Sequence, residues 1–387
     1  MLASETPKGI VLNVLWRLTL PVAGMPLVPG GPVRMAGVGM STSPKRRSRR
    51  ATPLTPEPLY RLGTAFWSSG VLFAAHRLAV FEVLEARPQT GSDLAGACRL
   101  TPAGAEKLLR ACASLGLVTE DEAGLYRNSP LATTFLVRGK PAYQGHLLDY
   151  FADLWARFGE LDHLLRTGEI GPREMAFNLV RPNDERQAAE RAWVLAMHEI
   201  ALGGQAEALC RAVDLSGYAR LLDVSGGAGS YALRFAEQYP GLTAEVFDLP
   251  EVVAIADELI QQSAVRDRVR VRAGDFVNAD YGYGYDVVLL SGVLHGLGER
   301  HILRVLKKSY AALNPGGCVI VQEMTPDAPS PSAAQFAALF SLNMMSGATY
   351  SAEQLALWLN QSGFLRITVT PLEQAWWFDH VISGRKP

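Results

Sequence analysis

Residues 221–231 read Leu-Leu-Asp-Val-Ser-Gly-Gly-Ala-Gly-Ser-Tyr, an apolar run followed by small residues. A helical pattern continues from this stretch through Ala232, Phe235 and Ala236. The stretch therefore predicts a strand, a tight turn and a helix. Because the turn lacks bulky side chains, a ligand can approach its backbone closely, and the following helix start offers free N–H groups. We expect a nucleotide-like cofactor to bind there.

Apolar runs and helical patterns alternate from Arg220 to the C-terminus. Strands are expected over residues 221–224, 244–247, 269–273, 287–290 and 318–321, and helices are expected to begin near Ser230, Pro250, Glu299 and Ser351. This alternation predicts an α/β fold with a doubly wound, Rossmann-like parallel sheet. Two further runs, 367–370 and 376–383, are typical of a terminal hairpin, which would add one antiparallel strand.

The chain before residue 140 shows a different pattern. It predicts a helix from Leu59 to about Leu84, a short capped helix after Thr90, a longer helix starting at Thr101-Pro102, and a hairpin over residues 117–127. Two helices followed by a hairpin are the layout of a winged helix.

A winged helix often binds DNA, but the charges of this one disfavour nucleic acid. The second helix offers only Lys107 and Arg110, and the wing tip carries Glu120, Asp121 and Glu122. Acidic residues where phosphates would lie weaken binding, so we expect no nucleic acid partner. The apolar residues of the preceding helix favour packing against a second copy of the chain, as a homodimer.

Charge separates the N-terminal segment from the rest of the chain. Residues 1–50 hold eight Lys/Arg and one acidic residue, whereas residues 51–387 hold 29 Lys/Arg and 37 Asp/Glu, a net charge of −8. The apolar run over residues 10–22 is too short and too interrupted to span a membrane. The four cysteines form no CxxC pair, which favours free thiols in a reducing, cytoplasmic compartment. We expect a disordered extension (1–55), a winged-helix-like dimerisation domain (56–140), a helical connector (141–213) and a cofactor domain (214–387).

The glycines of the turn fit two cofactors. Gly227-x-Gly229-x-x-Ala232 matches a relaxed dinucleotide fingerprint, and Asp248 lies where an acidic residue would bind ribose hydroxyls. The spacing Asp223-x-Ser225-x-Gly227-x-Gly229 also matches an S-adenosylmethionine loop, apart from the serine. Because both cofactors carry a ribose, Asp248 does not discriminate between them.

The residues that follow the later strands distinguish between the two cofactors better than Asp248 does. Asp275 and Phe276 follow the third strand, where an acid can accept the adenine amino group and an apolar ring can lie beside it. His295 follows the fourth strand and Glu323 ends the fifth. Ligands of such sheets bind outside the carboxyl ends of the strands. A histidine and a carboxylate on adjacent strand ends indicate a general base with an orienting partner.

These blocks resemble the two-domain, class I S-adenosylmethionine-dependent O-methyltransferases of the plant caffeic acid type and their bacterial relatives. The resemblance runs from about Leu59 to the C-terminus and is strongest over residues 221–363. It is carried by residues 222–229, Phe247-Asp-Leu-Pro250, Gly274-Asp-Phe276, Val293-Leu-His295 with Leu303-x-x-Leu306-Lys307, and Leu313-Asn-Pro-Gly-Gly317 through Val321-Gln-Glu323. Five such blocks in the family's order and spacing are specific.

The resemblance implies a methyltransferase domain that binds S-adenosyl-L-methionine and methylates a hydroxyl of a small aromatic or polyketide-like acceptor. It implies His295 as the general base and Glu323 as the carboxylate that orients it. Cofactor contacts are implied for Asp223, Ser225, Gly226, Gly227, Gly229, Asp248, Leu249, Asp275, Phe276 and Ser291. The acceptor pocket would include Trp193, Met197, Gly292 and Asn343.

Four positions depart from the family pattern. The family usually has glycine at Ser225 and aspartate at Gly296. Plant members have a bulky aromatic residue at Gly292, which predicts a roomier pocket here, and a second glutamate of theirs falls near Thr349. These differences leave the cofactor assignment intact, but they disfavour planar phenylpropanoid acceptors.

Three functions stay open at the level of sequence. The first is hydroxyl methylation, and the second keeps the cofactor but methylates sulfur, nitrogen or carbon. The third belongs to another class, either a nicotinamide-dependent oxidoreductase or a ligand-sensing DNA-binding regulator. His295 and Glu299 are four residues apart and would share a metal only on one helix, so no metal is expected.

Overall fold

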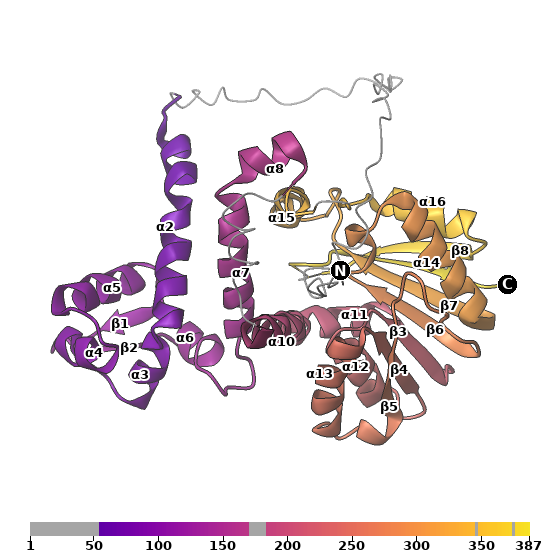
Figure 1. Ribbon diagram of the computed structural model, residues 1–387, viewed down its shortest axis with the longest axis horizontal. Helices are drawn as coiled ribbons and strands as arrows, with labels where there is room; N and C mark the ends of the chain where they lie inside the picture. Colours follow the sequence, from indigo (N-terminus) through magenta and orange to yellow (C-terminus); the bar gives the residue numbers. More distant parts are fainter. Residues whose placement is uncertain (1–53, 170–182, 345–346, 374–375) are drawn as a thin grey trace, which may run out of the picture.

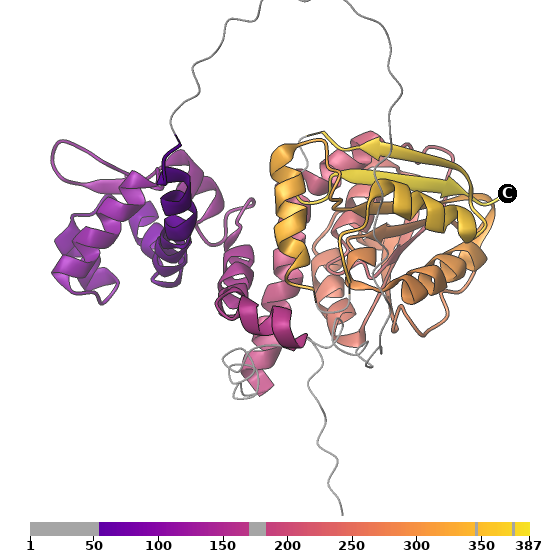
Figure 2. The same cartoon turned by 90° about the horizontal axis from the view of Figure 1, so that it is seen from above.

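The computed structural model describes residues 54–169, 183–344, 347–373 and 376–387. A helical N-terminal domain and an α/β domain lie side by side, and long connector helices stand between them (Figure 1 and Figure 2). Each domain has its own apolar core. The N-terminal core gathers around Phe81, Leu94 and Leu109, whereas the α/β domain has one core on each face of its sheet.

Seven strands form one sheet in the order β5-β4-β3-β6-β7-β9-β8. They are β3 (Arg220–Val224), β4 (Thr243–Asp248), β5 (Val269–Ala273), β6 (Tyr285–Ser291), β7 (Leu313–Glu323), β8 (Leu365–Pro371) and β9 (His380–Arg385). Strand β9 runs antiparallel to both neighbours, and the other pairs are parallel. The predicted doubly wound sheet with one antiparallel strand is confirmed. Residues 376–379, which the sequence pattern assigned to the last strand, lie before it in a loop instead.

Helices cover both faces of the sheet because successive strand residues point to opposite sides. Leu221 belongs to the core beneath α11 (Ala206–Ala212), α12 (Ser230–Gln238) and α13 (Pro250–Gln261). Leu222 belongs to the core beneath α14 (Glu299–Ala312) and α16 (Ala352–Gln361). The 3-10 turns η2 (Arg266–Arg268) and η3 (Leu294–Gly296) precede β5 and follow β6. Residues 221–224 of β3 are all buried because both faces of the strand are covered.

The N-terminal domain contains the helices and the hairpin expected of a winged helix. Its elements are α2 (Glu57–Arg77), α3 (Val80–Ala86), α4 (Gly91–Ala97), α5 (Pro102–Ser114), β1 (Val118–Glu120), β2 (Tyr126–Asn128) and α6 (Pro130–Phe135). Thr90 and Asp93 form a capping box at α4, and Thr101 caps α5. The continuous helix predicted over residues 59–84 is wrong, because Ala79 adopts a left-handed conformation (φ 55°) that separates α2 from α3.

The connector contains α7 (Gly145–Phe158), α8 (Leu161–Thr167), α10 (Asn183–Ile200) and a π-helical turn, η1 (Ala201–Gln205), that continues into α11. Gly204 in this turn has a φ of 113°, which side chains other than glycine rarely allow. Helix α15 (Pro331–Ser341), which the sequence pattern did not predict, shares an apolar cluster with α7 and α10. None of the described helices combines the length and the apolar character needed to cross a bilayer.

Candidate active site

The ring of His295 and the carboxylate of Glu323 meet at the carboxyl ends of two neighbouring strands, β6 and β7. Nδ1 of His295 lies 2.8 Å from Oε2 of Glu323, and Oε1 accepts a hydrogen bond from the backbone N–H of Leu294 at 2.6 Å. Because an ionised carboxylate only accepts hydrogen bonds, Nδ1 carries the proton and Nε2 is the basic nitrogen. The side chain of Glu323 is 2% exposed and that of His295 is 16% exposed, so the histidine is the partner open to a ligand.

The turn after β3 has a backbone that most residues avoid. Ser225 and Gly227 both have a φ of 55°, and Gly229 has a φ of 74°. A Cβ at Gly226 would lie 2.7 Å from Cγ of Asp223, so this position excludes a side chain for a steric reason. Ser225 therefore occupies a left-handed position that glycine would adopt with less strain. The turn places backbone N–H groups and the start of α12 at the carboxyl end of β3.

Two buried aspartates lie beneath this turn. Asp248 accepts hydrogen bonds from the backbone N–H groups of Gly227 and Leu249, both at 2.8 Å. Oδ2 of Asp223 is buried and has no hydrogen-bond partner among the described residues. Burial raises the pKa of Asp248 to about 6, and burial together with the Asp248 carboxylate raises the pKa of Asp223 to about 7. A ligand that brings hydroxyl and ammonium donors stabilises such carboxylates, so these residues fit S-adenosylmethionine.

The other residues assigned to the cofactor lie along the same edge of the sheet. Leu249 precedes α13, and Asp275 accepts two hydrogen bonds within the loop that follows β5. Ser291 ends β6 and donates to Oε1 of Gln322 at 2.8 Å. The ring of Phe276 packs in the core on the α14 side of the sheet. The residues assigned to the cofactor thus lie in or next to the carboxyl-terminal parts of β3, β4, β5 and β6.

Two residues assigned to the acceptor pocket lie on helix α10, but they belong to different apolar clusters. Met197 packs with side chains of α7, α15 and the loop before β9. Trp193, one turn earlier, packs against a cluster that contains Ala228 of the glycine turn and Val252 of α13. The structure therefore places Met197 on the side of the aromatic residues near His295 and Trp193 on the side of the cofactor residues.

The other two pocket residues have close neighbours. Asn343 is buried, and its Oδ1 accepts a hydrogen bond from Nη1 of Arg157 on α7 at 2.5 Å. A Cβ added at Gly292 would lie 2.5 Å from Cζ of Phe378. The ring of Phe378 thus fills the space that a side chain at position 292 would take. The expectation of a roomier pocket at Gly292 is therefore wrong.

Aromatic residues that the sequence analysis did not assign lie against the histidine. The rings of His295 and Phe378 are roughly parallel, with an interplanar angle of 28° and centroids 6.5 Å apart. The ring of Phe340 on α15 meets His295 edge to face at 5.9 Å. Trp377 packs in the same cluster. The aromatic content of these two segments was the only sequence signal for them, because packing between distant segments sets their position.

A second histidine lies beside the glycine turn. Nδ1 of His198 on α10 is 2.8 Å from Oγ of Ser230, the first residue of α12. Burial lowers the pKa of His198, which favours its neutral form. The sequence carries no local signal for this contact, because it joins two residues from different elements.

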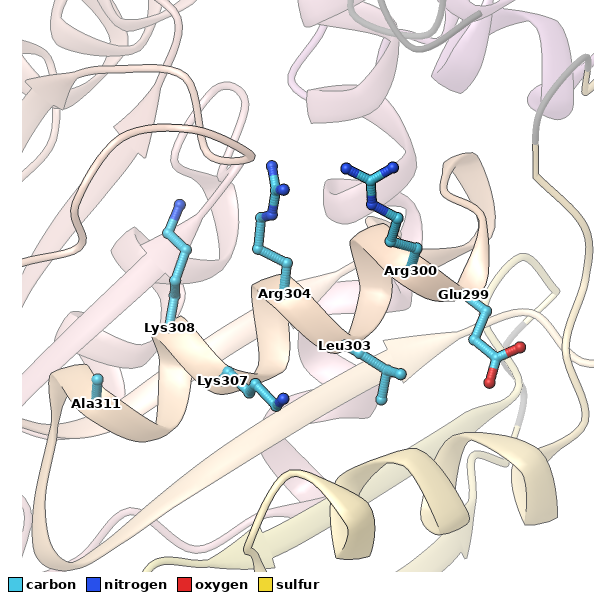
Figure 3. Close-up of a pocket in the computed structure, with 7 residues that line it drawn as sticks. All are labelled: Glu299, Arg300, Leu303, Arg304, Lys307, Lys308 and Ala311. Carbon is cyan, nitrogen blue, oxygen red and sulfur yellow. The ribbon is translucent and has the colours of Figure 1, made fainter. Parts of the chain in front are cut away.

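A separate hollow lies on the exposed side of α14. Figure 3 shows Arg300, Arg304 and Lys308 projecting from one side of this helix. All seven residues that line the hollow belong to α14, so it is a surface groove, and none of the residues assigned to the cofactor or the acceptor lines it. Among the described residues, no group of three or more His, Cys, Asp or Glu side chains is arranged to hold a metal ion. Glu299 accepts a hydrogen bond from Trp358.

Comparison with known proteins gives matches over both domains. The O-methyltransferase domain family matches residues 178–365, and the O-methyltransferase dimerisation domain family matches residues 60–138. The tetracenomycin polyketide synthesis 8-O-methyl transferase TcmO of Streptomyces glaucescens is 32% identical over 86% of this chain and 97% of its own length. The 3-hydroxy-5-methyl-1-naphthoate 3-O-methyltransferase of Streptomyces sahachiroi is 32% identical over 85% and 93%. The crystal structure of human N-acetylserotonin methyltransferase in complex with SAM superposes with a TM-score of 0.75 at 26% identity, covering 88% of this chain and 99% of that one.

Proposed function

The chain belongs to the O-methyltransferase family whose members carry a dimerisation domain, and we propose that it methylates a hydroxyl of a small aromatic molecule with His295 as the general base. It is an S-adenosylmethionine-dependent enzyme. One observation carries the assignment of the base. The hydrogen-bonded pair of His295 and Glu323 lies at the sheet edge where the residues that we assign to the cofactor also lie, and its imidazole packs near the aromatic rings of Phe340 and Phe378.

S-Adenosylmethionine supplies a methyl group on a sulfonium, which is already an activated donor. The protein has to align the acceptor and remove one proton from it. A phenol has a pKa of about 10, so its hydroxyl is mostly protonated at neutral pH. Nε2 of His295 would accept this proton as the new bond forms. Glu323 would hold the ring in the required tautomer and stabilise the imidazolium.

The cofactor contacts follow from the edge of the sheet. We assign the ribose hydroxyls to Asp248, because its carboxylate lies at the end of β4 beside the glycine turn. The turn itself and Ser291 would face the methionine part. Asp275 and Phe276, in the loop after β5, would contact the adenine. The elevated pKa values of Asp223 and Asp248 support this assignment, because donors from a bound ligand would stabilise the ionised carboxylates.

The acceptor is assigned to the class of phenolic secondary metabolites of polyketide type. One relative is named for a polyketide and another for a hydroxynaphthoate. The apolar cluster next to the base contains Phe336, Phe340, Trp377 and Phe378, which suits a flat aromatic ring. Methylation at nitrogen would need the same deprotonation geometry, so acceptors with an amine in place of the hydroxyl belong in the same screen.

We also infer a homodimer formed by the N-terminal domain. Along α2, the side chains of Leu59, Leu62, Phe66 and Trp67 are 55–71% exposed, although all four are large and apolar. Such a cluster on a surface helix is typical of a protein–protein interface. The four cysteines are free thiols, and together with the cofactor they favour a cytoplasmic location.

Two titrations test the proposed function. Calorimetry with S-adenosylhomocysteine should show binding to the wild type and loss of binding to Asp248→Ala, and NADH should not bind. Hydroxynaphthoates should then be screened with S-adenosylmethionine that is labelled in the methyl group. The expected product is a labelled aryl methyl ether, from which hydrolysis releases no labelled methanol. Binding of NADH alone would overturn the proposal, and a labelled methyl ester or amine product would move the reaction to another atom.

A further inference from the structure

We propose that residues 376–379 form an acceptor-recognition loop in which Phe378 limits the size of the acceptor that can reach His295. The inference rests on the proposed function, because it places the acceptor against His295. The loop lies between β8 and β9, far in sequence from the connector residues that the family resemblance assigns to the acceptor.

The first observation is the fit between Phe378 and Gly292. Gly292 has a φ of 64°, and a Cβ there would lie 2.5 Å from Cζ, 3.0 Å from Cε1 and 3.3 Å from Cε2 of the phenylalanine ring. A side chain at position 292 and the ring of Phe378 therefore exclude each other. In this protein, the space beside His295 is filled by a side chain of the C-terminal loop and not by a side chain at the end of β6.

The second observation is the anchoring of the loop backbone on one side. Gln205, at the end of the π-helical turn η1, is 4% exposed. In the amide orientation that pairs each donor with an acceptor, its nitrogen donates to the carbonyl of Phe378 at 3.3 Å and its oxygen accepts from the N–H groups of Trp376 and Trp377, both at 3.1 Å. One buried side chain thus holds three consecutive residues of the loop.

Asp379 anchors the loop on the other side. Its carboxylate accepts hydrogen bonds from the backbone N–H of Thr325 at 3.0 Å and from Oγ1 of Thr325 at 2.7 Å. Its own N–H donates to the carbonyl of Glu323 at 3.1 Å. The loop is therefore fixed directly to the strand end that carries the partner of His295.

The third observation is the position of the rings. Trp377 stacks on Phe151 of α7, with centroids 5.8 Å apart and an interplanar angle of 6°, and meets Phe336 of α15 at 4.7 Å. Phe378 is 9% exposed and lies roughly parallel to the ring of His295. Trp377 thus packs the loop against α7 and α15, while Phe378 takes up volume beside the base. An acceptor with an additional ring next to its hydroxyl would need the volume that Phe378 occupies.

The test compares the affinities of two ligands, 2-naphthol and 9-phenanthrol, for protein saturated with S-adenosylhomocysteine. The second ligand has one more ring, fused next to the carbon that bears the hydroxyl. Calorimetry gives the ratio of the two dissociation constants without requiring turnover. Phe378→Ala should shift this ratio toward 9-phenanthrol by about tenfold or more, since one methylene group in an apolar pocket already changes discrimination by about 10-fold to 200-fold. Gly292→Ala, which pushes on the same ring from the other side, should change the ratio in the wild type but not in the Phe378→Ala background.

A matched control separates pocket shape from general destabilisation. Phe364→Leu trims a fully buried ring in the core on the α14 side of the sheet, so it should lower the melting temperature and leave the ratio unchanged. A ratio in Phe378→Ala within twofold of the wild-type value would overturn the inference, as would failure of the wild type to bind either ligand while it binds S-adenosylhomocysteine. Failure to bind S-adenosylhomocysteine would instead count against the proposed function.

Discussion

Nδ1 of His295 lies 2.8 Å from Oε2 of Glu323, and these two residues stand at the ends of neighbouring parallel strands. The sheet brings them together although 28 positions separate them in the sequence. The same carboxylate accepts from the backbone N–H of Leu294, so it fixes both the turn after β6 and the tautomer of the ring. The pair therefore links the geometry of the sheet to the direction in which Nε2 can take a proton.

Glu323→Gln tests this link. The amide keeps the length of the side chain but carries no charge to stabilise the imidazolium, so we expect kcat to fall by about 10²-fold. The affinity for S-adenosylhomocysteine should stay within about twofold of wild type, because Glu323 is assigned no cofactor contact. Glu299→Gln is the control, since its carboxylate bonds Trp358 and not His295. Equal loss of kcat in both variants would contradict the orienting role.

Replacing Ser225 by glycine should make the folded protein more stable. Its φ of 55° is costly for a residue with a Cβ, by about 1–2 kcal/mol, and part of this is offset by the greater freedom of glycine in the unfolded chain. Ser225→Gly should therefore raise the free energy of unfolding by about 0.5–1 kcal/mol, measured by denaturant titration without cofactor. Gly227→Ala is the converse case, because its φ is also 55° and no atom lies within 4 Å of the added Cβ. It should lower the free energy of unfolding by about 1 kcal/mol. A less stable Ser225→Gly variant, or a Gly227→Ala variant more stable than the wild type, would contradict the strain argument.

Cofactor affinity should depend on pH through the two buried aspartates. Burial raises the pKa of Asp248 to about 6 and that of Asp223 to about 7, above the ordinary value of about 3.9. Hydroxyl and ammonium donors of the ligand favour the ionised carboxylates, so binding of S-adenosylhomocysteine should strengthen as the pH rises from 5 to 8 and should release protons. Each of the two carboxylates should contribute up to tenfold in affinity per pH unit below its own pKa. Calorimetry in buffers of different ionisation enthalpy measures the released protons.

The raised pKa values of the two aspartates also determine how the stability of the ligand-free protein changes with pH. Between about pH 4 and pH 7 the folded protein retains protons that the unfolded chain has lost, so the free energy of unfolding should fall as the pH rises through this window. Asp248→Asn removes one titrating group and should flatten both dependences. An affinity that is constant from pH 5 to pH 8 would contradict the assignment of Asp248 to the ribose.

The exposed apolar side chains of α2 predict the oligomeric state. Leu62→Asp and Phe66→Asp place a charge among side chains that we assign to the dimer interface, so the variants should be monomers by sedimentation equilibrium at micromolar concentration. Lys107→Glu, on the exposed side of α5, is the control and should leave the mass unchanged. A wild type that sediments as a monomer, or a Phe66→Asp variant that remains a dimer, would contradict the interface.

The sheet could be predicted from the sequence because its central strands are local apolar runs and glycine or proline marks the turns beside them. The residues at the strand ends followed from this order, since parallel strands present their carboxyl ends at one edge. The aromatic residues around His295 could not be predicted in this way. Phe340 lies on a helix with little amphipathic pattern, and Phe378 reaches the base through a loop whose anchors, Gln205 and Asp379, act over long sequence distances.

The break between α2 and α3 was missed for a related reason. Ala79 is an ordinary helix former, and its left-handed conformation follows from the packing of both helices on one core. The size of the pocket beside Gly292 could not be predicted from the sequence, because a distant side chain, Phe378, fills the space next to this glycine. Local patterns thus predicted the elements and their order, whereas tertiary packing decides the shape of the proposed acceptor site.

The most direct test of the account is the rate of methyl transfer from S-adenosylmethionine to a hydroxynaphthoate by wild type and His295→Ala, each saturated with both ligands. Loss of a general base predicts a kcat lower by about 10²–10⁴-fold, with an unchanged dissociation constant for S-adenosylhomocysteine. A His295→Ala enzyme that transfers the methyl group within about threefold of the wild-type rate would contradict the central claim.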